Sequence, residues 1–117
     1  MTKVLFHIID ATTWHEAREL GVYEPPGFAT EGFIHLSGHD QILRPANLLY
    51  HGRDGLLLLV IDSTALESDV VWEPGSHGEA ELFPHLYGPL NPDAVTRTVP
   101  FPCEADGNFR LPSGLLD

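Results

Sequence analysis

The sequence predicts an α+β domain in which two short helices precede a run of mostly strands. Apolar runs of strand length follow one another along the chain, and the 11 glycines and 10 prolines fall between them. The two patterns typical of helix starts both lie in the first half of the chain. Helices and strands that are segregated in this way favour an α+β fold over a doubly wound α/β fold.

The length and composition predict one folded domain, residues 1–117. The chain has 117 residues, of which 43% are hydrophobic and 20% are charged, as is typical of globular proteins. A domain of this size buries roughly two thirds of the surface of its unfolded chain. We therefore expect a hydrophobic core that needs no disulfide or metal ion to hold it together.

The first predicted elements are a strand, a helix and a loop. Residues 4–9 (VLFHII) are rich in β-branched and large apolar side chains, which favour a strand. Thr13 is followed three residues later by Glu16, which matches a capping box, so a helix is expected to begin there. Gly21 is placed to end that helix. Residues 23–30 contain prolines and a glycine and are predicted to be irregular and exposed.

A second strand and a second helix follow, and then a strand in the centre of the sheet. The strand is predicted over residues 31–37 (EGFIHLS). The helix is predicted over residues 41–50, with Asp40 as its cap and Pro45 in its early turns. Residues 56–62 (LLLLVID) form an unbroken apolar run, which is typical of a strand covered on both faces. Further strands are predicted over residues 70–73, 83–88 and 94–101.

Charge and cysteine content exclude several classes of protein. The chain has 6 lysines and arginines against 17 aspartates and glutamates, a formal net charge of -11. Nucleic acids and anionic membranes both attract clustered basic charge, so neither is expected as a partner. The single cysteine, Cys103, excludes an internal disulfide and a thiolate zinc cage. The first residues do not resemble a signal peptide, and no apolar run spans a bilayer, so a cytoplasmic location is expected.

Histidine is the unusual residue of this chain, because the 7 histidines outnumber the lysines and arginines together. Three of them lie on predicted strands: His7, His35 and His85. Side chains alternate between the two faces of a strand. Phe33 and Ser37 therefore share a face with His35, and Tyr87 shares a face with His85. The other four are expected at the surface or in loops: His15, His39, His51 and His77.

The chemistry of these histidines stays open at this stage. Each one has a structural interpretation, as a buried or rim side chain that hydrogen bonds to a neighbour. A zinc or iron site built from His7, His35 and His85 is a second interpretation. A third is acid–base chemistry next to a carboxylate, for which the sequence offers Glu73 and Glu81. Such a carboxylate stabilises an oxocarbenium-like transition state or binds ribose hydroxyls.

The motifs also resemble a known family. A first strand with His7, a tryptophan in a short helix, EGFIHLS, Gln41, LLLVID, WEP and FPHLYGPL occur in order from His7 to about Pro112. Together they resemble the small bacterial family called domain of unknown function 952. EGFIHxS and FPHLYG are the most specific of these motifs.

The resemblance implies an ADP-ribosyltransferase-like fold, which is a split, curved antiparallel sheet with two short helices and a cleft between its halves. Proteins of that fold bind NAD across the split. The resemblance assigns the ribose contact to His7 and places His35 and Ser37 on the second core strand. It assigns support of glycosidic bond cleavage to Glu81 or Glu73. The net charge of -11 counts against the branch of that superfamily that acts on RNA.

The leading hypothesis is a small enzyme, a transferase or glycohydrolase, whose cleft binds a nucleotide or ribosyl ligand with NAD as the candidate. His7, His35 and His85 would supply hydrogen bonds or acid–base chemistry near neutral pH, with Glu81 or Glu73 beside them. Ligand contacts are predicted for Phe33, Ser37, Gln41 and Tyr87. One alternative is a non-catalytic small-molecule-binding or interaction module of the same fold. The other alternative is a His-ligated metal-dependent hydrolase.

Overall fold

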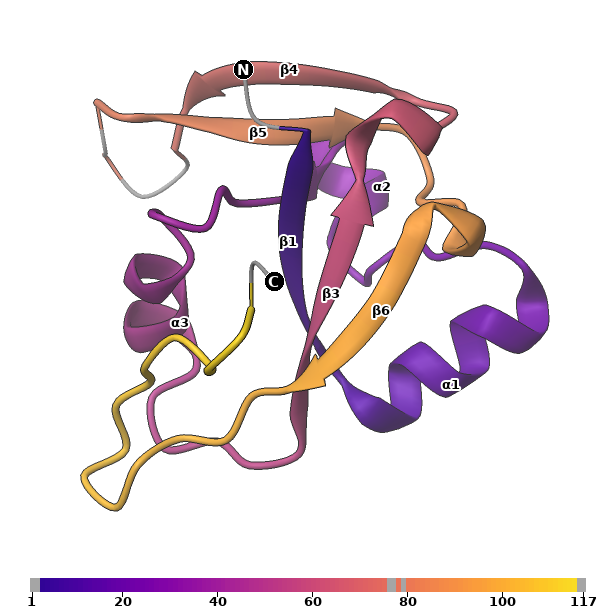
Figure 1. Ribbon diagram of the computed structural model, residues 1–117. Helices are drawn as coiled ribbons and strands as arrows, with labels where there is room; N and C mark the ends of the chain where they lie inside the picture. Colours follow the sequence, from indigo (N-terminus) through magenta and orange to yellow (C-terminus); the bar gives the residue numbers. More distant parts are fainter. Residues whose placement is uncertain (1–2, 76–77, 79, 116–117) are drawn as a thin grey trace.

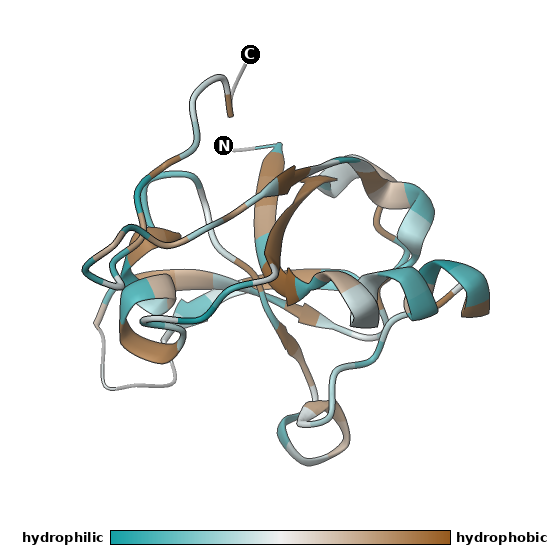
Figure 2. Ribbon diagram, turned by 90° about the horizontal axis from the view of Figure 1, so that it is seen from below, coloured by the Kyte–Doolittle hydropathy of each residue, from teal (hydrophilic) through white to brown (hydrophobic). Residues whose placement is uncertain are grey.

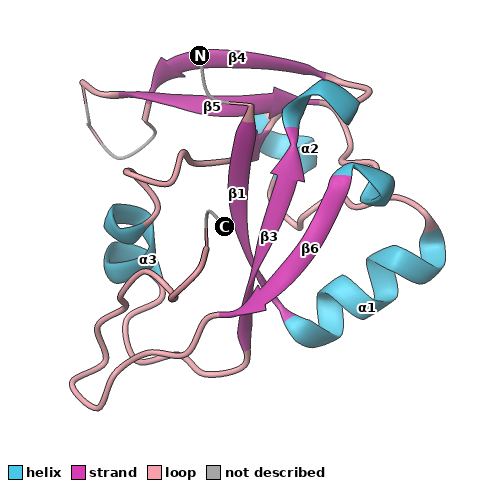
Figure 3. Ribbon diagram, in the orientation of Figure 1, coloured by secondary structure: helices cyan, strands magenta, loops and turns pink. Residues whose placement is uncertain are grey.

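The computed structural model describes residues 3–75, 78 and 80–115. It confirms the predicted α+β class: two antiparallel three-stranded sheets with few helices (Figures 1 and 3). The first sheet has the order β1-β3-β6, with strands β1 (Val4–Asp10), β3 (Leu56–Asp62) and β6 (Val95–Pro100). The second sheet has the order β2-β5-β4, with strands β2 (Ile34–His35), β5 (Leu82–Tyr87) and β4 (Asp69–Pro74).

The two sheets meet where the segment after β2 passes β1. Ser37 and Phe6 exchange both of their backbone hydrogen bonds there, at 2.9 and 2.8 Å. A second isolated bridge joins Tyr23 to Leu90. The sheets are therefore connected through the Phe6–Ser37 bridge rather than by a continuous ladder, since Tyr23 and Leu90 belong to neither sheet. The β4–β5 pair crosses one end of the first sheet (Figure 1).

Strand β3 lies between β1 and β6 and is covered on both faces, as its unbroken apolar sequence predicts. The alternation along β1 divides the core into two clusters. Leu5 and Ile9 pack on the side of Trp14, and Phe6 and Ile8 pack on the side of Phe101. Figure 2 shows the hydrophobic colour concentrated on these central strands.

Helix α1 (Ala11–Leu20) ends as predicted but begins earlier than predicted. Gly21 adopts φ 79° and its N–H donates to the carbonyl of Ala17, which is the expected left-handed end. The predicted cap at Thr13 is wrong. The Asp10 carboxylate accepts hydrogen bonds from the Thr13 N–H at 3.0 Å and the Thr13 hydroxyl at 2.7 Å. Asp10 is the N-cap because it leaves β1 in an extended conformation three residues before Thr13.

The segment between α1 and β3 differs most from the prediction. The expected irregular loop contains α2 (Phe28–Glu31), which ends at Gly32 with φ 83°. Tyr23, which was expected to be exposed, is buried. Because Glu31 belongs to α2, the predicted strand over residues 31–37 shrinks to the two residues of β2 and the Ser37 bridge.

Helix α3 (Leu43–Leu49) is shorter than the helix predicted over residues 41–50, and Asp40 is not its cap. The helix starts from Ile42, where no side chain caps it, and the Gln41 side chain just before it accepts the Gly38 N–H. Strands β4, β5 and β6 confirm the three late strands to within about a residue at each end. Short 3₁₀ turns, η1 (Ser63–Ala65) and η2 (Pro92–Ala94), precede β4 and β6. In the described part of the chain, no helix has the length and apolar composition needed to cross a membrane.

Candidate functional site

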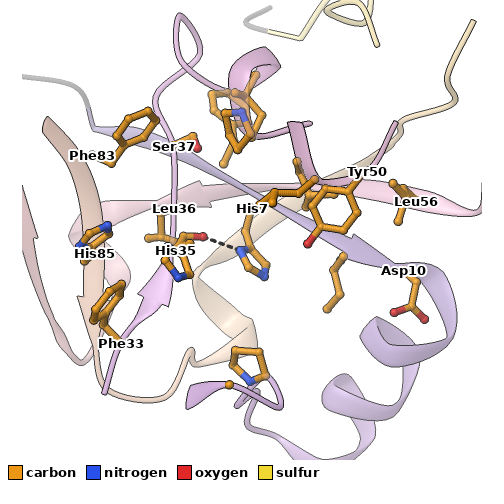
Figure 4. A pocket seen from close by; sticks show the side chains of 18 of the residues that line it. His7, Asp10, Phe33, His35, Leu36, Ser37, Tyr50, Leu56, Phe83 and His85 are labelled. Atoms are coloured by element: carbon orange, nitrogen blue, oxygen red, sulfur yellow. Dashed lines mark hydrogen bonds between the residues drawn. The ribbon is translucent and has the colours of Figure 1, made fainter. Parts of the chain in front are cut away.

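A cavity of about 350 Å³ lies beside the joint between the two sheets. Its walls come from β1, the segment from Tyr23 to Ser37, α3 with the turn after it, and β5 (Figure 4). Apolar and aromatic side chains make up most of the wall, and a few polar side chains interrupt it. Of the residues predicted from the sequence, the cavity wall contains His7, Phe33, His35, Ser37 and His85.

His7 lies in the middle of the cavity wall and is held in one tautomer. Its Nδ1 donates to the backbone carbonyl of His35 at 2.7 Å (Figure 4). Because a carbonyl only accepts, Nδ1 carries the proton and Nε2 of the neutral ring is an acceptor. The Tyr23 hydroxyl lies 3.4 Å from Nε2 and donates to it. The hydrogen bond to the His35 carbonyl thus orients the His7 ring across the joint between the sheets.

His7 is neutral at physiological pH. Burial lowers its pKa from 6.5 to about 4, because the charged ring would lose its hydration. The hydrogen bond to the His35 carbonyl raises the pKa, but by less than burial lowers it. Of the two roles expected for His7, hydrogen bonding and acid–base chemistry near neutral pH, a neutral ring suits the first, with Nε2 as the hydrogen-bond acceptor.

Phe33 and His35 form an aromatic end of the cavity with His85. The rings of Phe33 and His85 stack with centroids 4.1 Å apart and planes at 16°, and the His35 ring meets Phe33 edge-on at 4.9 Å. His35 and His85 are directly paired across β2 and β5. The His35 side chain is 44% exposed, and its Nε2 lies 3.1 Å from the carboxylate of Glu31.

His85 is the most buried of the three histidines, at 2% exposed, and it is paired with Glu73. Its Nδ1 donates to Glu73 Oε1 at 2.9 Å, and the Tyr87 hydroxyl donates to the same oxygen. These hydrogen bonds lower the pKa of Glu73, which stabilises the carboxylate. His85 Nε2 is buried and has no hydrogen-bond partner among the described residues. In the neutral form of the ring, the hydrogen bond to Glu73 places the proton on Nδ1 and leaves the lone pair on Nε2.

Glu81 and Gln41 lie together, outside the cavity wall. The Gln41 amide donates to the Glu81 carboxylate at 3.0 Å and to the Leu82 carbonyl at 2.6 Å, and Arg44 forms an ion pair with Glu81. These contacts join α3 to the start of β5. Glu73 and Tyr87 also lie outside the cavity wall, but Glu73, unlike Glu81, is hydrogen bonded to a histidine of that wall.

The remaining histidine predictions have mixed outcomes. His15, His39 and His51 are exposed, as expected, whereas His77 lies outside the described residues. Among the residues that the structure describes, no three His, Cys, Asp or Glu side chains are grouped so as to hold a metal ion. In that part of the chain, the proposed zinc or iron site has no ligand set.

Sequence reasoning missed the polar end of the cavity opposite Phe33. Asp10, Tyr50 and Arg53 line it there, and Tyr23, whose hydroxyl lies 3.4 Å from His7 Nε2, lines the cavity as well. In Figure 4, Tyr50 and Asp10 lie on one side of His7, and the aromatic end lies on the other. No local pattern marks these residues, because they come from three separate segments: the end of β1, the segment after α1, and the turn after α3 that holds both Tyr50 and Arg53. Only Asp10 carried a signal, since an aspartate three residues before a threonine is typical of a helix start.

The chain is similar over nearly its whole length to the protein CC0527 from Caulobacter crescentus. The crystal structure of that protein has a TM-score of 0.82 and 32% sequence identity, covering 92% of this chain and 94% of that one. A double mutant of CC0527 gives a TM-score of 0.82 at 31% identity, and its solution NMR structure gives 0.77 at 32%. Among proteins with curated descriptions, none matches this chain. The model of one family matches residues 8–98, so the chain belongs to the family described as protein of unknown function (DUF952).

Proposed function

We propose that the cavity binds a nucleotide or another ribosyl ligand, with NAD as the first compound to test. The observation that carries the proposal is the convergence of His7, His35 and His85, from three strands, on one cavity. A volume of about 350 Å³ is that of a small-molecule site, and a mostly apolar wall with a few polar groups is typical of such sites.

The polar groups suit the parts of a ribosyl ligand. The unprotonated Nε2 of His7 would accept a hydrogen bond from a ribose hydroxyl, which would compete with the hydroxyl of Tyr23. Phe33 and His35 would contact a flat ring, since aromatic side chains bind planar groups through stacking and edge contacts. Ser37 at the joint would supply a further hydroxyl.

Glu73 and His85 are the acid–base pair of this proposal. A carboxylate that fixes the tautomer of a histidine makes the second ring nitrogen available for proton transfer. A buried polar atom without a partner is costly to stability, by about 1–3 kcal/mol, and such atoms are retained where they serve a purpose. Tyr87 would help to orient Glu73.

The arrangement of the sheets also supports an ADP-ribosyltransferase-like assignment. Two antiparallel sheets meet at the isolated Phe6–Ser37 bridge, and the cavity lies beside that joint. This is the place at which a split sheet of that type would bind NAD. Glu73 is the late-strand carboxylate of the proposal, because it is hydrogen bonded to a cavity histidine whereas Glu81 is bonded to Gln41.

The non-catalytic alternative rests on one observation. Because His85 Nε2 is buried, a ligand in the cavity reaches it only if Phe33 or His35 moves. If these rings stay in place, the protein binds its ligand without turning it over.

The binding test uses two matched histidines. His35 and His15 are both exposed and both face a glutamate four residues away, but only His35 lines the cavity. Calorimetric titration with NAD is expected to show saturable binding that His35→Ala weakens by at least about tenfold, which is about 1.4 kcal/mol. His15→Ala is expected to leave the affinity unchanged. The absence of binding at millimolar NAD contradicts the NAD assignment.

Catalysis is tested on the same samples. ¹H NMR of NAD incubated with the protein is expected to show release of nicotinamide, and Glu73→Gln is expected to abolish release while binding persists. Glu81→Gln is the matched control, because Glu81 is hydrogen bonded but lies away from the cavity. Binding without release in the native protein would favour the non-catalytic module.

A further inference from the structure

The end of the cavity opposite Phe33 contains a cation without a carboxylate partner. Arg53 is the one lysine or arginine among the described residues that line the cavity. Among the described residues, no carboxylate oxygen lies within 4.0 Å of its guanidinium. Arg44 and Arg110 form ion pairs, and Arg18 and Arg97, which are also without one among those residues, lie outside the cavity wall. In a chain of net charge -11, an anion is repelled unless a cation stands at its binding site.

Tyr50 adds a hydrogen-bond donor next to this cation. The Arg53 guanidinium lies over the Tyr50 ring, 5.3 Å from its centroid. Burial raises the pKa of Tyr50, so its hydroxyl stays protonated and donates at physiological pH. The Tyr50 hydroxyl has no hydrogen-bond partner among the described residues.

Asp10 supplies the one carboxylate among the described residues that line this end of the cavity, and it already has hydrogen-bond partners. Both of its oxygens accept hydrogen bonds from Thr13, at 3.0 and 2.7 Å, where they cap α1. Its charge weakens the field of Arg53, but its oxygens accept from Thr13 and not from the Arg53 guanidinium or the Tyr50 hydroxyl, so those donors remain available. Guanidinium is also suited to phosphate, because its N–H groups match two phosphate oxygens at once.

We propose that Arg53 and Tyr50 form a phosphate subsite, and that the ligand is a mononucleotide whose ribose lies at His7 and whose flat ring lies at Phe33 and His35. This inference rests on the proposed function and narrows it. A cavity of about 350 Å³ is near the lower end of the roughly 300–1,000 Å³ typical of ligand sites. A mononucleotide is one half of a dinucleotide such as NAD. In this proposal that half fills the cavity, and the other half of NAD lies outside it.

The test compares each mononucleotide with its nucleoside by calorimetry at low salt. Nicotinamide mononucleotide is compared with nicotinamide riboside, and AMP with adenosine. For at least one pair, the native protein is expected to bind the phosphorylated member at least about tenfold more tightly, a difference of about 1.4 kcal/mol. Arg53→Gln is expected to remove that preference and leave the affinity for the nucleoside unchanged.

Two further variants control for charge and for folding. Arg53→Lys keeps the charge without the paired donors and is expected to keep part of the preference. Arg110→Gln removes a similar charge from an exposed side chain that pairs with Glu104, and it is expected to change nothing. Arg53 is itself exposed, so its replacement leaves the core intact.

The outcomes separate this inference from the proposed function. Equal binding of nucleoside and mononucleotide, or an equal loss of both in Arg53→Gln, overturns the phosphate subsite and leaves ribosyl binding standing. A preference that Arg110→Gln also removes shows a general charge effect and overturns the subsite as well. If neither NAD nor any of these compounds binds, both the subsite and the proposed function are overturned.

Discussion

The burial of His7 predicts that this protein loses stability between pH 6.5 and pH 4. In the unfolded chain the His7 ring has its ordinary pKa of 6.5, whereas burial lowers the pKa to about 4 in the folded protein. Well above pH 6.5 the His7 ring is neutral in both the folded and the unfolded protein, so it adds no pH dependence to the free energy of unfolding. As the pH falls, the unfolded state takes up a proton that the folded state does not bind, so the free energy of unfolding decreases.

The size of this loss follows from the shift. Each unit of pKa difference corresponds to about 1.4 kcal/mol. A fall from 6.5 to about 4 therefore predicts a total loss of roughly 3 kcal/mol from His7, nearly complete at pH 4. This is a large part of the total stability of an ordinary domain, which is about 5–15 kcal/mol.

The assay is urea denaturation at a series of pH values, followed by the fluorescence of the buried Trp14. His7→Asn removes the titrating ring but keeps an N–H donor for the His35 carbonyl. Its free energy of unfolding is expected to be lower at pH 7, because the shorter side chain leaves a void. Between pH 6.5 and 4 the loss is expected to be smaller than in the native protein by roughly 3 kcal/mol.

The control is His15→Asn, because the His15 ring lies exposed on α1. It is expected to keep the acid loss of the native protein, since the carboxylates titrate equally in all three proteins. An unchanged acid loss in His7→Asn would falsify the buried, neutral His7. NMR titration of the native protein checks the same point directly: the His7 ring signals are expected to stay constant from pH 8 to about 5.

Three further changes test local features. Asp10→Ala removes the cap of α1 and is expected to lower the free energy of unfolding by about 1 kcal/mol in urea denaturation, and an unchanged midpoint would argue against this cap. Gly21→Ala is expected to cost about 1–2 kcal/mol in the same measurement, since a Cβ meets no atom within 4 Å and only the φ of 79° opposes it. Glu73→Gln is expected to release the single tautomer of His85, which ¹⁵N NMR of the ring would record as a mixture. One unchanged tautomer in that variant would contradict the role of Glu73.

The sheet could be predicted because its signals are local. The apolar run of residues 56–62 and the apolar residues of β1 are strands in the structure, and both faces of β3 are buried as expected. The predictions failed where a neighbouring side chain or helix took the place of the predicted cap or strand. Asp10 took the cap expected at Thr13, and a short helix at Glu31 shortened the second strand.

For the candidate site, the sequence by itself determined three of the histidines that line the cavity. Strand alternation selected His7, His35 and His85 from seven histidines, and all three line one cavity. Only the tertiary structure decided how each of these rings is buried and which groups it is hydrogen bonded to. His7 is neutral because segments far along the chain bury it, and Glu73 rather than Glu81 reaches a cavity histidine because β4 pairs with β5. Alternation depends on neighbours in the chain, whereas burial and hydrogen-bond partners depend on how distant segments pack.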